Sequence, residues 1–216
     1  SMLERFWEPA RHGGRPMLLC MDYARAYHVS REFGPDDTIA GREIVANNDG
    51  LVGAGGIHAI SAITAMLTRM GVEIEIRIGP DTSFGDLRHS PVVVMGCYNN
   101  RWAPLMYEEL RFGFSTQHDV AQVEERKPPH RKWVAQTPMT YGVLSRVFHP
   151  TTGGLVIGIA GISHNGTRAV AEFATNASLL AGALADAPAD WEKKNLQIVL
   201  RSQVIANTPA PAKVMA

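Results

Sequence analysis

The sequence has little cysteine, no long apolar run and no excess of either charge. Two cysteines in 216 residues are too few for a disulfide scaffold. No run approaches the roughly 18–20 apolar residues of a membrane span. Lys and Arg total 21, as do Asp and Glu, whereas a nucleic-acid-binding surface normally shows a basic excess. We therefore expect no membrane segment in this chain and no nucleic acid bound by this domain itself.

The sequence motifs of common catalytic and metal sites are also missing. The eight histidines include no His-x-His or His-x-x-x-His pair, and there is no Gly-x-Ser-x-Gly nucleophile elbow. Ser163 and His164 are adjacent, and chain neighbours rarely face each other as a nucleophile and its base. We assign no catalytic residue, no metal ligand and no cofactor.

The sequence does contain an alternation of strand and helix patterns. Its length predicts one domain over residues 1–216, with an entry segment at 1–15 and an exit tail at 207–216. Strands are expected at residues 16–21, 72–78, 91–96, 141–148, 155–160 and 196–205, and helices at 3–9, 55–70, 102–110 and 167–184. This alternation is typical of an α/β fold, and we expect a three-layer sandwich.

Local patterns refine the expected sheet. Residues 72–78 alternate between apolar and charged side chains, which is typical of an edge strand, whereas residues 91–96 are apolar throughout and favour a central one. The turn signals at 150–154 predict an antiparallel hairpin, so the sheet should be mixed but mostly parallel. Residues 22–54 are polar with turn signals at 36–37 and 47–50, and residues 117–138 favour a long loop.

Three expected loops lie at the carboxyl ends of strands, where open α/β sheets bind ligands. They carry Asp22 and Tyr23, residues 96–102, and residues 161–168. In the second loop, Tyr98 and Trp102 offer flat rings for stacking, and the adjacent residues 99–100 are asparagines. The alternative is that these asparagines cap the next helix and that Trp102 packs in the core.

The loop 161–168 has the clearest chemistry. A helix N-terminus attracts anions, and Gly161 and Gly166 would let the backbone approach a ligand closely. Their spacing matches the start of a phosphate-binding P-loop, but Thr167 and Arg168 stand where that motif needs Lys and then Ser or Thr, which disfavours nucleoside triphosphate hydrolysis. The alternative is a structural turn in which Asn165 or Thr167 is the N-cap.

Four parts of the chain, in this order and spacing, carry a family resemblance. They are Arg5-Phe6-Trp7-Glu8-Pro9 before residues 16–20; Gly56-Ile57-His58; residues 82–88 followed by 92–102; and Tyr141-Gly142-Val143 leading to Ala160-Gly161-Ile162, Gly166-Thr167 and Glu172-Phe173. The chain resembles a bacterial family of sensor-like modules found downstream of winged-helix DNA-binding domains, often with a membrane helix between. The resemblance implies a part of a larger regulatory protein, and it carries over no catalytic residue.

Our leading hypothesis is a non-catalytic small-molecule-sensing or interaction domain that binds at the carboxyl edge of the sheet. Two arginines in the loops favour a small acidic or phosphorylated molecule. The expected ligand-binding residues are Tyr98, Asn99, Asn100, Arg101, Ser163, His164, Asn165, Thr167 and Arg168.

Two alternatives stay open. The first is an enzyme acting on a nucleotide, sugar or phosphate-bearing substrate at the same edge, with His164 as acid or base and Asp22 or Asp86 assisting. The second is an interaction or homodimer module with an exposed apolar patch around Phe6, Trp7 or the helix at 55–70. The compartment is open too: extracytoplasmic if a membrane helix lies upstream, and otherwise cytoplasmic.

Overall fold

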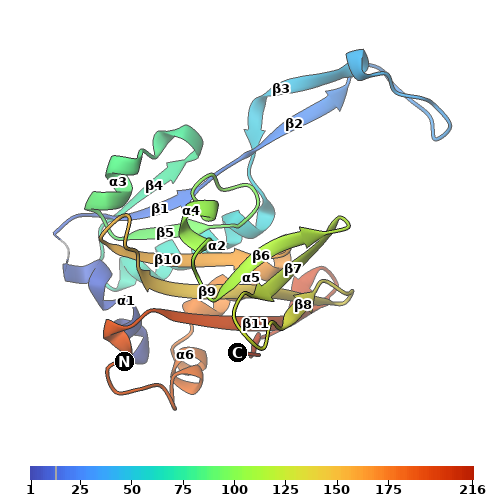
Figure 1. The fold of residues 1–216 in the computed structure, drawn as a ribbon. Coiled ribbons are helices and arrows are strands. Elements are labelled where there is room, and N and C mark those ends of the chain that lie inside the picture. The colour runs from blue at the N-terminus through green and yellow to red at the C-terminus, as the bar shows by residue number, and fades with distance from the viewer. Residues whose placement is uncertain (13) are drawn as a thin grey trace.

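An eight-stranded mixed sheet forms the body of the protein (Figure 1). The computed structural model describes residues 1–12 and 14–216, apart from the side chains of residues 9–12, 48 and 80. The strand order is β12-β11-β9-β10-β5-β1-β4, and β13 also pairs with β11. The bounds are β1 Met17–Met21, β4 Ile74–Ile78, β5 Val92–Met95, β9 Met139–Phe148, β10 Leu155–Gly161, β11 Leu196–Ile205, β12 Thr208–Pro209 and β13 Lys213–Val214.

The direction of the strands confirms the expected mixed sheet. Strands β4, β1, β5 and β10 run parallel, and β9 is antiparallel to both of its neighbours, β10 and β11. The predicted edge strand is β4, the predicted central strand is β5, and the predicted hairpin is β9–β10. The fold is therefore α/β with a mostly parallel sheet, as the apolar patterns indicated.

One face of the sheet is covered by helices. They are α1 Met2–His12, α2 Ala54–Arg69, α5 His164–Ala174 and α6 Ala177–Ala183. Leu19, Val93 and Ile157 stand side by side in register on β1, β5 and β10, and all three are buried in the core beneath these helices. Because side chains alternate along a strand, their neighbours Leu18, Val92 and Val156 point to the opposite face.

The opposite face carries two short helices and a small second sheet. The helices are α3 Phe84–His89 and α4 Ala103–Tyr107, and the sheet consists of β6 Phe112–Gln117, β7 Val120–Glu125 and β8 Lys132–Val134. The regular three-layer sandwich stays a prediction, because this face has no continuous helical layer. The long loop expected at 117–138 is wrong, since β7 and β8 occupy much of it.

A buried carboxylate held by two exposed arginines helps to explain why the sequence concealed this second sheet. Glu125 ends β7 with only 2% of its surface exposed, and its carboxylate accepts hydrogen bonds from Arg111 (2.8 Å) and Arg131 (2.7 Å). Burial opposes ionisation of this carboxyl, but the bond from Arg131, together with Arg111, lowers its pKa to about 2. A strand that buries a charged residue in this way does not show the alternation by which a strand is recognised.

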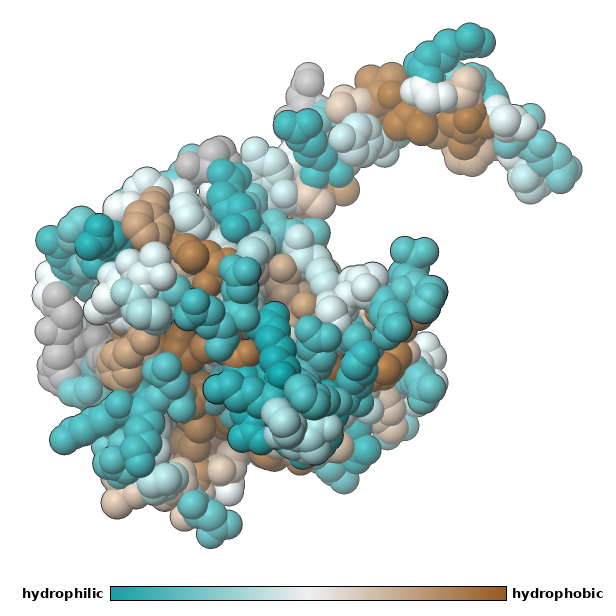
Figure 2. Space-filling model, viewed as in Figure 1, coloured by the Kyte–Doolittle hydropathy of each residue, from teal (hydrophilic) through white to brown (hydrophobic). Residues whose placement is uncertain are grey.

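An antiparallel ribbon, β2 Ala24–Val29 with β3 Ile44–Leu51, projects from the body (Figure 1). We call this ribbon and the residues between its strands the arm. The expected turn at 47–50 is wrong, because these residues lie within β3. Tyr27, Phe33 and Ile44 on the arm are each about half exposed, and Figure 2 shows apolar side chains gathered there. Phe6 and Trp7, by contrast, are fully buried, so the apolar patch expected around them is wrong.

Two of the expected helices differ in extent. The helix expected at 167–184 is two helices, because the side chain of Asn176 accepts hydrogen bonds from the N–H groups of Ser178 and Leu179 and so starts α6. Helix α4 is shorter than the expected 102–110.

Three short 3-10 helices, Gly41–Glu43, Gly79–Asp81 and Trp191–Lys193, join other elements. Residues 207–216, expected to form an exit tail, instead belong to the sheet, since β12 and β13 within them pair with β11.

Glycines let α5 pack directly on the backbone of the sheet. A Cβ atom placed on Gly166 would lie 2.6 Å from the carbonyl oxygen of Tyr141, and one on Gly161 would lie 2.2 Å from the backbone nitrogen of Thr167. Gly142 on β9 would likewise meet Val170, at 2.4 Å. These glycines therefore bring helix and strand together. Whether the backbone here also approaches a ligand, as the sequence suggested, stays a prediction.

Replacing Gly166 by alanine should destabilise the protein. The new methyl group meets backbone atoms that cannot rotate away, and such overpacking costs about 1–3 kcal/mol. Gly182, also inside a helix, has no atom within 4 Å of its would-be Cβ, so Gly182→Ala should be neutral or stabilise by up to about 1 kcal/mol. Urea unfolding of both variants measures the difference, and equal stabilities would contradict the proposed packing constraint.

Candidate functional site

A hollow of about 270 Å³ lies at the carboxyl ends of β1, β5 and β10. After β1 the chain passes through the arm to α2 on one face of the sheet, whereas after β5 it passes to α4 on the other. Such divergence of neighbouring loops opens a crevice, which is where α/β sheets bind ligands. We call this the polar hollow. Its lining residues are Met21, Asp22, Val52, Gly53, Gly55, Gly56, Met95, Gly96, Cys97, Tyr98, Asn99, Asn100, Gly161, Ile162, Ser163, His164 and Thr167.

Six of the nine expected site residues line this hollow, and three do not. Tyr98, Asn99, Asn100, Ser163, His164 and Thr167 are brought together there. Arg101, Asn165 and Arg168 are not among the lining residues. The loops 96–102 and 161–168 thus share one edge of the sheet, as the sequence-based hypothesis required, and whether a ligand binds between them stays a prediction.

The two absent arginines are paired with carboxylates. Arg168 Nε lies 2.7 Å from Glu172 Oε1, one helical turn further along α5. Arg101 Nε donates to Asp22 Oδ2 at 2.9 Å. Burial raises the pKa of Asp22, but hydrogen bonds from Arg101 and from the Tyr23 backbone N–H outweigh it, so this pKa lies below its ordinary value. The positive charges expected to attract an acidic ligand are therefore already balanced.

Asn100 joins the ends of the two central strands. Its side chain is buried, and Nδ2 donates to the carbonyl oxygens of Cys20 (3.2 Å) on β1 and Met95 (3.0 Å) on β5. Its Oδ1 accepts from the N–H of Trp102 at 2.9 Å, just before α4. Asn100 is not a side-chain cap of α4, whose N-cap is Trp102. It lines the polar hollow and joins the strand ends beneath it, and its contact with a ligand stays a prediction.

Helices α2 and α5 both begin at the polar hollow, but only α5 has a side-chain cap. Ser163 Oγ accepts from Gly166 N–H at 3.1 Å, so Ser163 is the N-cap expected at Asn165 or Thr167. The N-cap of α2 is Gly53, which has no side chain to accept a hydrogen bond. The first turn of α2 therefore presents the positive end of a helix dipole without a side-chain acceptor, although the Gly53 carbonyl oxygen accepts from Gly56 N–H at 2.9 Å.

His164 lies on the rim of the hollow beside a residue from the chain terminus. Its Nε2 is 3.2 Å from Asn207 Oδ1, and Asn165 Nδ2 donates to the same oxygen at 3.2 Å. Because that amide oxygen can only accept, His164 Nε2 is the donor in this contact. Asp86, the other expected assistant to His164, instead forms a capping box with Ser83 at the start of α3.

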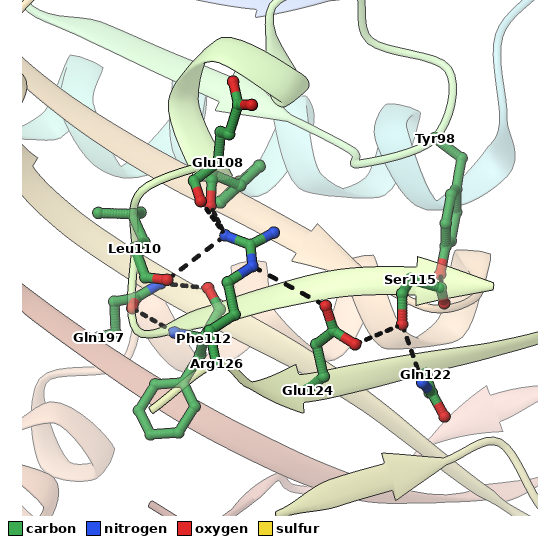
Figure 3. Close-up of polar contacts among 10 residues, drawn as sticks. Tyr98, Glu108, Leu110, Phe112, Ser115, Gln122, Glu124, Arg126 and Gln197 are labelled. Atoms are coloured by element: carbon green, nitrogen blue, oxygen red, sulfur yellow. Dashed lines mark hydrogen bonds and ion pairs between the residues drawn. The ribbon is translucent and has the colours of Figure 1, made fainter. Parts of the chain in front are cut away.

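Tyr98 forms the outer wall and is held by the second sheet (Figure 3). Its hydroxyl donates to the carbonyl oxygen of Ser115 at 3.2 Å. Ser115 Oγ in turn donates to Glu124 (2.8 Å) and accepts from Gln122 (2.9 Å). Burial raises the pKa of Tyr98 to about 12, so this hydroxyl is a hydrogen-bond donor at neutral pH.

Neither thiol nor any metal cluster adds chemistry here. Cys20 is buried and Cys97 half-buried, and both are free thiols. Within residues 1–12 and 14–216, no three His, Cys, Asp or Glu side chains gather in a way that would hold a metal ion. Over the same residues, no helix is both long enough and apolar enough to cross a membrane.

Sequence reasoning missed the start of α2 as part of the site. Gly53, Gly55 and Gly56 all line the polar hollow, although the arm separates them from β1 by a long stretch of sequence. A signal was present, since three glycines within four residues directly before an apolar helix are unusual for a helix start. Asn207 was missed because the last residues were assigned to an exit tail.

Replacing Asn100 by alanine should destabilise the protein by about 2–3 kcal/mol, because two buried carbonyl oxygens lose their donor. The neighbouring Asn99 is exposed, so Asn99→Ala should change stability by no more than about 0.5 kcal/mol. Thermal unfolding of both variants measures the contrast. A similar small effect for each would show that Asn100 does not join the strands.

Both cysteines should resist alkylation in the folded protein. Burial raises the pKa of Cys20 to about 11 and that of Cys97 to about 12, and the thiolate is the reactive form. Near pH 8, iodoacetamide should modify either thiol at least about a hundred times more slowly than in the denaturant-unfolded chain, as peptide mass spectrometry would show. Modification of native Cys97 at the unfolded rate would contradict this.

Comparison of the chain with protein-family models, with curated proteins and with solved structures finds no match. No relative therefore supplies a ligand, a partner or an assembly state for this edge of the sheet. The resemblance to bacterial sensor-like modules stays an expectation.

Proposed function

We propose that this domain binds a small molecule in the polar hollow and serves as the ligand-sensing part of a larger regulatory protein. The observation that carries the proposal is the position of the hollow, between loops that leave β1 and β5 for opposite faces of the sheet. We further propose a three-layer α/β framework around it, with the second sheet completing the outer layer. The regulatory role rests on the family resemblance.

An acidic or phosphorylated group is the ligand chemistry that fits best. The preference for an anion rests on α2, because the two arginines are already paired. The first turn of α2 has neither a side-chain cap nor an acidic residue. Gly55 and Gly56 line the hollow there without side chains of their own. An oxygen-rich anion placed there would meet the favourable end of the helix dipole and could accept from backbone N–H groups that precede Gly56.

A catalytic role has less support in the same geometry. The hydrogen-bond partner of His164 is the amide of Asn207, and Asp22 is engaged by Arg101. A general acid or base needs a partner that orients it and a reacting proton within reach. We therefore propose that the domain binds its ligand without catalysing a reaction.

Gly56→Leu should abolish ligand binding without unfolding the protein. A Cβ on Gly56 would meet only the flexible end of Met21 at 2.8 Å and Val52 at 3.8 Å, so a leucine there projects into the hollow. Calorimetry with inorganic phosphate and a panel of phosphorylated and carboxylated metabolites should show an affinity at least about tenfold weaker than that of the wild type.

Arg168→Ala is the matched control, since Arg168 lies on the same edge but outside the lining. It should change affinity by less than about twofold, the level expected of a paired surface charge. Ligands that bind Gly56→Leu as well as the wild type, in a variant whose thermal unfolding is unchanged, would place the site elsewhere and end the proposal.

A further inference from the structure

A second hollow of about 310 Å³ shares two lining residues with the polar one. It lies between α4 and β6, and we call it the apolar hollow. Cys97 and Tyr98 line both hollows, so the two meet at these residues. The remaining lining residues are Ala103, Pro104, Tyr107, Glu108, Phe114 and Arg126.

Aromatic rings form the walls of the apolar hollow. The rings of Tyr107 and Phe114 lie 5.5 Å apart at 80°, and those of Tyr98 and Phe114 lie 6.4 Å apart at 72°. Three rings in edge-to-face contact present flat faces and edges to a neighbouring group. Such a surface favours a planar aromatic or apolar group over a compact polar one.

The buried polar atoms nearby are not all satisfied. The hydroxyl of Tyr107 is buried without a hydrogen-bond partner and lies against Gly158 of β10, where a Cβ would meet it at 2.4 Å. Buried hydroxyl groups in proteins normally have a partner. Tyr107, which lines the apolar hollow, therefore keeps a buried hydroxyl group without a hydrogen-bond partner.

The one cation on the rim is already engaged (Figure 3). The Arg126 guanidinium donates to the carbonyl oxygens of Tyr107, Glu108 (2.7 Å) and Leu110 (3.4 Å) at the end of α4. Its Nε also lies 3.8 Å from Glu124. Since Nη1 donates to these carbonyls and Nε faces Glu124, Arg126 ties the end of α4 to the second sheet at the wall of the apolar hollow.

The sizes of the two hollows favour joint use. Ligand pockets usually measure roughly 300–1,000 Å³, so the polar hollow at about 270 Å³ and the apolar one at about 310 Å³ lie at the lower limit when taken singly. One ligand that occupies both would have a site of ordinary size. Its two ends would face opposite chemistry, an uncapped helix start and a set of aromatic rings.

We propose that the two hollows form one bipartite site for an amphipathic small molecule. Its anionic or acceptor-bearing end lies at the first turn of α2, its flat apolar end lies against Phe114, and the chain between them passes Tyr98. This inference rests on the proposed function, because it uses the same polar hollow, and it adds the chemical class of the rest of the ligand.

The amphipathic probe 1-anilinonaphthalene-8-sulfonate, which combines an anionic group with flat rings, tests this proposal on the whole chain. We expect fluorescence titration to show saturable one-site binding. Phe114→Ala, which removes an aromatic wall, and Gly56→Leu, which fills the polar hollow, should each weaken the affinity at least about fivefold. Phe114→Leu keeps the wall apolar, so its affinity for the probe should fall less than that of Phe114→Ala. This comparison separates a loss of the binding wall from misfolding of the variant.

Phe33→Ala is the matched control. Phe33 is an exposed phenylalanine on the arm, outside both hollows, and its loss should leave the probe affinity unchanged. A loss with Phe33→Ala as large as that with Phe114→Ala would place the probe on the arm and overturn the inference, as would an absence of saturable binding.

Inorganic phosphate separates the two proposals, because it carries the anionic group alone. Gly56→Leu should weaken phosphate binding while Phe114→Ala leaves it unchanged. If Gly56→Leu weakens both ligands but Phe114→Ala weakens neither, the polar site stands and the bipartite inference falls. If Gly56→Leu affects neither ligand, the proposed function itself fails.

Discussion

The close approach of α2 and α5 at Gly55 is the contact on which the candidate site depends. A Cβ atom on Gly55 would lie 2.2 Å from the carbonyl oxygen of His164, so the two helix starts meet backbone to backbone. Gly161 and Gly166 hold α5 equally close to β10 and β9. Since none of these glycines could carry a side chain without moving the backbone, they fix both helix starts at the carboxyl edge of β1, β5 and β10.

This contact also decides which helix start is available to a ligand. At α5 the Ser163 side chain supplies a cap, and Ser163 is itself fixed by a 2.7 Å hydrogen bond between its Oγ and that of Thr140 on β9. At α2 the N-cap is Gly53, which has no side chain to accept a hydrogen bond. Close packing requires glycine at Gly55, and the start of α2 therefore carries little side-chain bulk where it lines the polar hollow.

The sequence predicted the parts of the fold that a single local pattern specifies. The apolar run at β5, the alternation at β4 and the hairpin turn before β10 each encode one element and its place in the sheet, and each was confirmed. It could not predict β7, because Glu125 is buried by its partners Arg111 and Arg131, which stand elsewhere along the chain. Tertiary pairing of this kind overrides local pattern.

The site shows the same limit in its charges. The sequence correctly predicted that the loops 96–102 and 161–168 lie together. Neighbouring parallel strands end at the same edge of a sheet, whatever side chains their loops carry. Whether an arginine there is available depends on its partners, and both Arg101 and Arg168 have carboxylates within 3 Å. An arginine already paired gains little from a second anion, since binding it must compete with the existing carboxylate. Our proposal for the ligand therefore rests on the backbone at the start of α2, and not on the formal charges beside it.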